Sequence, residues 1–217
     1  MNFGDLPLNL VMIAIFLGVA FPVHEFAHAF VAYVRGDATA KLFGRMTLNP
    51  VVHFDPVGGL MTVVSIFLGG FLIGWAKPTP VNPMNLRDRR NGEVLVALAG
   101  PASNLIMAAL AAIVIRIIVA AEIEPPILVQ QVLIRFVQIN VLLAVFNLIP
   151  IPPLDGSKVL YAFLDPQTAW RVRPVLEQYG TIILLVAVFL PIFGGQTLLD
   201  IVFGTILTPL LRLLVGQ

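Results

Sequence analysis

Three ionisable side chains lie together near the end of the first apolar run of this chain, in the stretch FPVHEFAHAF (residues 21–30). On a helix, His24 and His28 share one face and can bind the same cation. Glu25 lies near such a cation without being aligned with the two ligands, as the general base of an H-E-x-x-H site does. A chance match is the alternative, but ionisable groups inside a bilayer segment are usually functional. The spacing therefore predicts a metal site that activates water.

A catalytic zinc site needs a third protein ligand and an open position for water. The chain has no cysteine, which leaves His53 and the carboxylates as candidates. Asp155, in NLIPIPPLDG, follows an apolar run whose prolines cannot continue a regular helix. Such a break at membrane depth must be enclosed by protein or line a watery cavity, and it can bring a carboxylate to a metal. On the residues alone, a surface turn in which Asp155 caps a helix starting near Ser157 is an equally good interpretation.

The elements that must position these residues are membrane helices. The chain has 217 residues, of which 59% are hydrophobic and only 12% charged, as in an integral membrane protein. Its formal net charge of +1 argues against nucleic acid as a partner. Apolar runs of a length suited to a bilayer occupy residues 6–34, 57–75, 94–120, 127–148, 177–193 and 197–215.

We therefore expect an all-α polytopic membrane protein with five or six transmembrane segments, in contact with the lipid bilayer. Residues 1–217 form one membrane-embedded domain in this prediction. Its catalytic core covers about residues 6–165, and a helical hairpin over 177–215 completes it. The composition predicts no particular oligomeric state.

Basic residues flank the run 57–75 on both sides, which places both connections in the cytoplasm. The run also contains five glycines, so we favour a membrane-dipping hairpin over a full crossing; a plain six-span arrangement is the alternative. The proline-containing stretch 69–83 is compatible with a short edge strand. The N-terminus is then outside. The histidines lie roughly 24 Å along the first helix from Leu8, nearer the cytoplasmic face.

Three separated motifs, HEFAHAF, GPASN and NLIPIPPLDG, resemble in this order the site-2 protease family of intramembrane zinc metalloproteases. The intervening GRMTLNPVVHFDPVG and GWAKPTPVNP are similar to compact prokaryotic members, which lack PDZ and CBS domains. The resemblance covers about residues 20–165. It implies one zinc per chain, bound by His24, His28 and Asp155, with Glu25 as the catalytic base.

The resemblance also implies a function and a location. The expected protein is a multi-pass zinc endopeptidase of a prokaryotic plasma membrane, which cleaves membrane-protein substrates within or near their transmembrane segments. A divalent-metal transporter is one alternative, but it would distribute its ligands along a path and would not need Glu25 beside the first ligand. A catalytically inactive relative that only binds membrane proteins is another, and the intact H-E-x-x-H and L-D-G motifs argue against it.

Three further polar residues have candidate supporting roles. In similar proteases an asparagine at the place of Asn147 faces the active site, where its amide can donate to the oxyanion; satisfying carbonyls near Pro150 is an equal alternative. Asn104 can hydrogen-bond across helices or hold a ligand, and we favour the structural role. His53 as a fourth ligand would close the site to water, so we favour a loop or supporting role.

Overall fold

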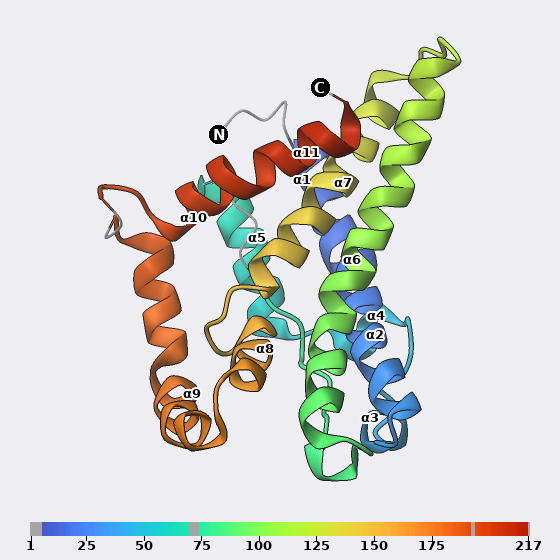
Figure 1. Cartoon of the computed structure of the whole chain (residues 1–217). Helices are drawn as coiled ribbons and strands as arrows, with labels where there is room; N and C mark the ends of the chain where they lie inside the picture. The colour runs from blue at the N-terminus through green and yellow to red at the C-terminus, as the bar shows by residue number, and fades with distance from the viewer. Residues whose placement is uncertain (1–5, 70–73, 192–193, 217) are drawn as a thin grey trace.

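The computed structural model describes residues 6–69, 74–191 and 194–216, and every regular element in these ranges is a helix (Figure 1). The all-α class predicted from the sequence is therefore confirmed for the described residues. Long helices run side by side through the molecule, and short helices and irregular connections gather at its two ends.

The short strand predicted within residues 69–83 is not formed in the part that the structure describes, because residues 74–82 have no regular structure. An edge strand needs a neighbouring strand to pair with, and the prolines of this stretch remove several of the necessary donors. Residues 70–73 of the same prediction lie outside the described residues.

The first long helix is continuous and carries H-E-x-x-H in its second half. It consists of α1 (Leu6–Ile15), the π-helical segment η2 (Phe16–Ala20) and α2 (Phe21–Val34). Pro22 has no N–H to donate to the carbonyl four residues earlier, and the widened π turn lies directly before it. The helix is therefore irregular just before the two histidines.

Among the described residues, 4 helices are long and apolar enough to cross a membrane. Besides the first helix, they are α6 (Arg89–Ala120), α7 (Ile127–Asn147) and α9 (Pro166–Phe189). Asp165 accepts hydrogen bonds from two backbone N–H groups in the first turn of α9, and this cap explains why α9 begins before the predicted residue 177. These helices support a helical membrane protein, and the count of five or six segments stays a prediction.

The other helices in the described ranges are shorter. They are α3 (Thr39–Leu42), α4 (Pro50–His53), α5 (Pro56–Gly69), η3 (Pro83–Asn85), α8 (Gly156–Phe163), α10 (Leu198–Ile201), η4 (Val202–Leu207) and α11 (Thr208–Val215). The last three cross over α6 and α7 at the end of the molecule opposite α3 and α8 (Figure 1). The two arms of the predicted hairpin over 177–215 therefore meet at α10 and separate beyond it.

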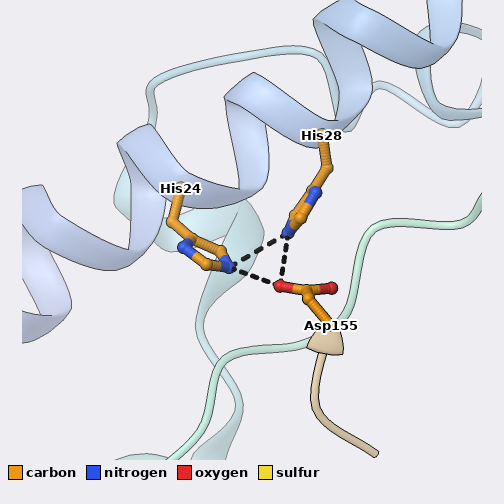
Figure 2. Close-up of side chains that lie close together, drawn as sticks. All are labelled: His24, His28 and Asp155. Carbon is orange, nitrogen blue, oxygen red and sulfur yellow. Dashed lines mark hydrogen bonds and ion pairs between the residues drawn. The ribbon is translucent and has the colours of Figure 1, made fainter. Parts of the chain in front are cut away.

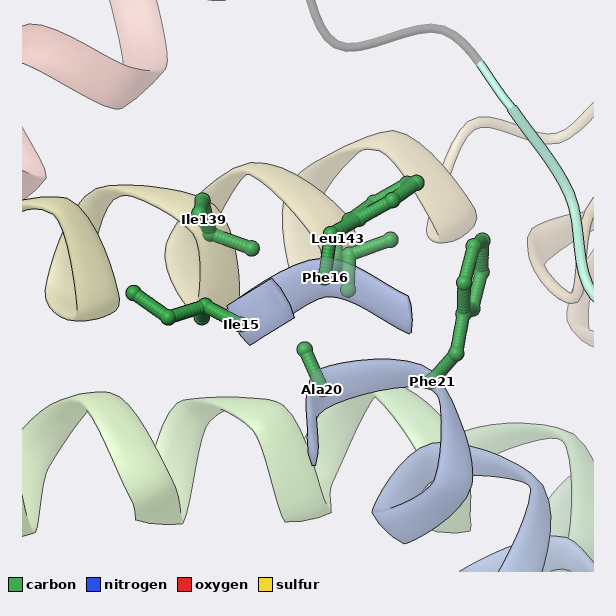
Figure 3. Packing of buried hydrophobic residues seen from close by; sticks show 6 residues of the cluster. All are labelled: Ile15, Phe16, Ala20, Phe21, Ile139 and Leu143. Atoms are coloured by element: carbon green, nitrogen blue, oxygen red, sulfur yellow. The ribbon is translucent and has the colours of Figure 1, made fainter. Parts of the chain in front are cut away.

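A cluster of buried apolar side chains joins the first helix to α7 (Figure 3). Its members are Ile15, Phe16, Ala20, Phe21, Ile139 and Leu143. On the other side of α7, α6 packs through Ala108, Ala111 and Ala112, whose small side chains let the helix axes approach closely. This packing fixes α2, α6 and α7 relative to one another, so residues from all three can face one point.

The two ends of the segment around α5 lie side by side. The backbone N–H of Lys77 donates to the carbonyl of His53 at 2.8 Å. Gly58 makes a close approach possible, because a Cβ there would lie 2.0 Å from the carbonyl oxygen of Trp75. The chain therefore leaves and rejoins the same end of the molecule around α5.

The helix α9 lies at the edge of the molecule, against the irregular chain between α7 and α8 (Figure 1). A Cβ on Gly180 would lie 2.6 Å from the carbonyl oxygen of Pro152, so this glycine lets the helix lie directly on the turn. Leu184 and Val188 of α9 pack with Leu154 of the turn in one buried cluster. In this way α9 supports the turn that carries Asp155.

Candidate functional site

His24, His28 and Asp155 meet at one point in the interior (Figure 2). The Nε2 atoms of the two histidines lie 3.0 Å apart, and Oδ2 of Asp155 lies 3.2 Å from that of His24 and 3.1 Å from that of His28. All three residues are buried. The fold thus brings together the predicted ligand set, although 131 positions separate His24 from Asp155.

Hydrogen bonds on the far side of each imidazole leave both Nε2 atoms available to a cation. Nδ1 of His24 lies 2.6 Å from Oδ1 of Asn104, and Nδ1 of His28 lies 2.6 Å from the carbonyl oxygen of Val96. These oxygens only accept hydrogen bonds, so each Nδ1 carries the proton. In the neutral imidazole the lone pair is then on Nε2, the atom that faces Asp155.

A chain of side-chain amides fixes the orientation of Asn104. Its Nδ2 donates to Oδ1 of Asn140 at 2.9 Å, and Nδ2 of Asn140 donates to the carbonyl of Phe136 at 2.9 Å. Because a backbone carbonyl cannot donate, the direction of the whole chain is set at Phe136, and Oδ1 of Asn104 must face His24. Metal-binding histidines typically have such a partner, which orients the ring.

Gly100 on α6 leaves space beside the two histidines. A Cβ at this position would lie 2.4 Å from Nε2 of His28 and 2.5 Å from Nε2 of His24. A zinc–nitrogen bond is about 2.0–2.1 Å long, so a side chain here would compete with an ion for the space beside both nitrogens. The glycine therefore serves the candidate site as well as the close packing of helices.

Asp155 reaches the histidines because α7 ends at Asn147 and the chain turns before α8 begins. The side chain of Asp155 makes no capping hydrogen bond to α8, which argues against the helix-cap interpretation. Gly156 allows the turn to close, since a Cβ there would lie 2.2 Å from the carbonyl oxygen of Leu148. The break in the helix thus aims one carboxylate at the histidines.

The surroundings of Asp155 favour its ionised form. Burial raises the pKa of this carboxyl, and the positive charge of Lys158 lowers it. Nζ of Lys158 lies 3.4 Å from Oδ1. Asp155 is therefore a carboxylate at neutral pH, as a metal ligand must be.

The three donor atoms fit a tetrahedral zinc ion. Ligands at about 2.0–2.1 Å from zinc lie about 3.3 Å apart in a tetrahedron. The separations between the three atoms are 3.0, 3.1 and 3.2 Å. A cation also removes the repulsion between two nitrogen lone pairs and a carboxylate at such short range. Two imidazoles and one carboxylate leave the fourth position to water or substrate.

Glu25 is buried beside the histidines on the same helix. Its Oε2 accepts a hydrogen bond from the backbone N–H of Thr79 at 2.8 Å, and its backbone carbonyl accepts one from the Thr79 hydroxyl at 3.1 Å. The sequence motifs do not indicate Thr79. A backbone donor carries no signal in the residue type, so this contact becomes visible only in the folded chain.

Asn147 and His53 lie outside the ligand cluster, and no hydrogen bond among the described residues joins them to it. Nδ2 of Asn147 donates to the carbonyl of Leu143, one turn earlier in α7, at 3.0 Å. Its role toward an oxyanion stays a prediction. Nε2 of the buried His53 lies 2.8 Å from the carbonyl oxygen of Thr47, so this side chain contributes to the loop before α5.

From the sequence, no role at the site was predicted for Gly100 or Asn140, and a structural role was favoured for Asn104. One signal for two of them was present, because Gly100 and Asn104 are four residues apart and therefore share a helix face. Nothing in the sequence indicated that this face meets the histidines, since that depends on how α2 and α6 pack.

A model of peptidase family M50 matches residues 12–122 and 118–193 of the chain. The chain is 39% identical over 191 residues to "Putative zinc metalloprotease YwhC" of Bacillus subtilis (strain 168). The aligned region covers 86% of this chain and 84% of that protein. It is 35% identical over 174 residues to "Putative zinc metalloprotease Rip2" of Mycolicibacterium smegmatis. That aligned region covers 78% of this chain and 63% of the relative.

The chain therefore spans less than two thirds of the length of the second relative and most of the first. No solved structure was found to match it. The family match covers the region that contains the histidines, the glycine and asparagine of α6, and Asp155. On these matches, the chain belongs to peptidase family M50, the site-2 protease family that its three motifs resemble.

Proposed function

We propose that this protein is an intramembrane zinc metalloendopeptidase, which hydrolyses peptide bonds within or near the transmembrane segments of membrane-protein substrates. The observation that carries the proposal is the convergence of His24, His28 and Asp155 beside Glu25, among helices of membrane length. Membership of family M50 and the names of both relatives favour the same chemistry. The expected cofactor is one zinc ion per chain.

Each residue of the site has a task in this proposal. His24, His28 and Asp155 hold the zinc, which when bound supplies a Lewis acid for the water and for the scissile carbonyl. Glu25 takes a proton from the water and returns it to the leaving amine. Asn147 exchanges its bond to its own helix for one to the oxyanion, and a preorganised donor of this kind is typically worth about 3 kcal/mol.

The stretch 74–82 is the proposed place of substrate capture. A transmembrane helix has its backbone hydrogen bonds satisfied internally, so it must unwind before a peptide bond can reach the site. The irregular stretch 74–82 runs past Glu25, and an unwound substrate can add to its backbone as a neighbouring strand does. Cysteine crosslinks between a trapped substrate and positions 74–80 test this idea, and their uniform absence would contradict it.

The proposed arrangement in the membrane rests on the basic residues and on the segment around α5. Its two ends are joined by the hydrogen bond between His53 and Lys77, which favours a membrane-dipping hairpin over a crossing. The basic connections before and after it then both face the cytoplasm. This puts the N-terminus outside and the active site nearer the cytoplasmic face of a prokaryotic plasma membrane.

Metal analysis and cleavage of a model transmembrane substrate by the purified protein test the proposal together. We expect about one zinc per chain. Glu25→Gln should keep the zinc and lower kcat at least about 100-fold, because a general base typically contributes that much or more. Asp155→Ala should lose both zinc and activity.

Each alternative has its own outcome in this experiment. Full zinc binding by Asp155→Ala would refute the ligand set, and full activity of Glu25→Gln would refute the role of the base. A metal transporter would keep its flux after Glu25→Gln. A protein that holds zinc and cleaves no transmembrane substrate would be the inactive relative.

A further inference from the structure

One peptide unit lies between a buried arginine and Glu25. The carbonyl oxygen of Pro78 accepts a hydrogen bond from Nη2 of Arg45 at 3.2 Å. The N–H of Thr79, in the same peptide unit, donates to Oε2 of Glu25 at 2.8 Å. Arg45 is 6% exposed and Glu25 is 9% exposed. A guanidinium and a carboxylate are thus linked through a single peptide group.

The sequence Lys-Pro-Thr-Pro makes this donor unique. Pro78 and Pro80 have no N–H, so Thr79 supplies the single backbone donor of residues 78–80. Each proline also restricts the residue before it to extended backbone, which keeps Lys77 and Thr79 out of a helix. The stretch is therefore stiff, and it presents one N–H at a fixed place.

Arg45 has no carboxylate partner among the described residues, although a buried cation is normally paired. Its donors go instead to the backbone carbonyls of Val52, Lys77 and Pro78. A guanidinium that polarises a carbonyl strengthens the N–H of the same peptide group as a donor. Glu25 is the carboxylate that receives this donor, so it is the indirect partner of Arg45.

We infer that Arg45 and the Thr79 amide are positioning residues for Glu25. They hold Oε2, while Oε1 receives no hydrogen bond from the part of the chain that the structure describes, so Oε1 faces the water to be activated. The inference rests on the proposed function, in which Glu25 is the general base. It gives residues 77–79 a task of their own, and substrate capture falls to the rest of the stretch 74–82. The Thr79 N–H is used for Glu25 and is not available to a substrate.

Substitutions at Thr79 separate the amide from the side chain. Thr79→Pro removes the N–H, whereas the matched control Thr79→Val removes the hydroxyl and keeps the N–H. Arg45→Met removes the guanidinium at a similar side-chain length. Because a general base contributes about 100-fold or more, its misplacement by Thr79→Pro or Arg45→Met should lower kcat about ten- to a hundredfold.

Two further measurements identify a positioning role. KM should stay within about twofold of the wild-type value, because the change affects the transition state and not substrate binding. Zinc content should be unchanged, because the ligands are untouched. Thr79→Val should lower kcat less than Thr79→Pro does, since the amide that holds the base is retained.

Hydrogen exchange gives a readout that does not depend on activity. The Thr79 N–H should exchange slowly in the wild-type protein, because it is bonded to a buried carboxylate. Glu25→Ala should raise its exchange rate at least about tenfold, while amides in the middle of α7 keep theirs. Fast exchange along α7 would identify a variant that has lost its fold.

The outcomes distinguish this inference from the proposed function. Wild-type kcat in Thr79→Pro, in a protein that Glu25→Gln inactivates, would overturn the inference and leave the proposed function intact. Full activity of Glu25→Gln would instead overturn the proposed function. If Thr79→Pro and Arg45→Met do not fold, the exchange comparison decides, and a Thr79 rate that Glu25→Ala leaves unchanged would overturn the inference.

Discussion

Gly100 contributes to the candidate site by having no side chain. We predict that Gly100→Ala weakens zinc binding by more than about 100-fold, beyond the effect typical of groups that surround a metal site, because its methyl group takes the space beside both Nε2 atoms. Zinc content after dialysis against a chelator measures this. Gly18→Ala is the matched control on the first helix, since a Cβ there meets nothing within 4 Å. A Gly100→Ala protein that retains its zinc would contradict the prediction.

Asn104 acts on the site through His24. Asn104→Leu removes the acceptor of the Nδ1 proton, so the ring loses its fixed orientation and zinc affinity should fall about ten- to a hundredfold. Competition with a chelator of known affinity measures the change. Asn140→Leu should have a smaller effect of the same sign, because Asn140 reaches His24 only through Asn104. A larger effect at Asn140 than at Asn104 would contradict the proposed order of the hydrogen-bond chain, in which Asn104 is the direct partner of His24.

At the scale of residues, the sequence was informative where geometry is local. The spacing of His24, Glu25 and His28 on one helix fixes which side chains share a face, so their grouping was predictable. The residues alone left open whether Asp155 is a metal ligand or a helix cap, and the family resemblance favoured the ligand. The partner of Asn104 and the donor to Glu25 were not predictable, because both arise where elements distant in the chain come into contact.

At the scale of elements, Asp37 ties the stretch after residue 74 to the end of α2. Its carboxylate accepts hydrogen bonds from the N–H of Asn82 at 2.7 Å, Nδ2 of Asn85 at 2.9 Å and the N–H of Thr39 at 3.0 Å. We predict that Asp37→Ala lowers the free energy of unfolding by roughly 3 kcal/mol, because buried donors lose their acceptor. Thermal unfolding in detergent measures this loss.

The pH dependence of that loss follows from the ionisation of Asp37. Burial raises the pKa of the carboxyl, but the bonds from Thr39, Asn85 and Asn82 lower it by more, so the folded pKa lies below the ordinary value. The stabilisation is complete above the ordinary pKa and is lost as pH falls through the folded one. The difference in melting temperature from Asp37→Ala should stay constant between about pH 5 and 8 and shrink below about pH 4. If this difference in melting temperature already shrinks between pH 5 and 8, the stabilisation does not come from an Asp37 carboxylate with a lowered pKa.

Element boundaries were predictable where apolar runs coincide with helices, as in α7 and most of α6. The start of α9 was missed because its first turns are charged. Arg173 in those turns pairs with Glu93 of α6 and with Glu177 of α9 itself, and such pairing makes a charged segment compatible with a helix. The predicted strand depended on a pairing partner, which the composition of one segment cannot supply.

At the scale of the whole molecule, the absence of cysteine makes single-cysteine labelling a direct test of the arrangement in the membrane. Cysteines at the exposed positions Lys41, Arg87 and Arg171 should react with an impermeant reagent from the cytoplasmic side, and one at Glu124 from the outside. Labelling in inside-out and in right-side-out vesicles distinguishes the two sides of the membrane. Labelling of positions 41 and 87 from opposite sides would mean that the chain around α5 crosses the bilayer.

In the proposed membrane arrangement, the helix α6 also gives the depth of the site. Its last charged residue before the apolar stretch is Glu93, and Gly100 lies about two turns further along, roughly 10 Å by the rise of a helix. A substrate should therefore be cut about six or seven residues inside the border of its own apolar stretch. Mass spectrometry of the products measures this offset, and cuts scattered along the whole substrate helix would contradict it.

This proposed depth determines whether the product on the cytoplasmic side stays in the membrane. A fragment that ends about six or seven residues beyond the border retains roughly a third of the apolar residues that anchor a chain across a bilayer. So short an apolar segment anchors a fragment in the bilayer only weakly. In the proposed reaction, the released piece would then diffuse away unaided, so that a single hydrolysis would convert a membrane-bound substrate into a soluble fragment.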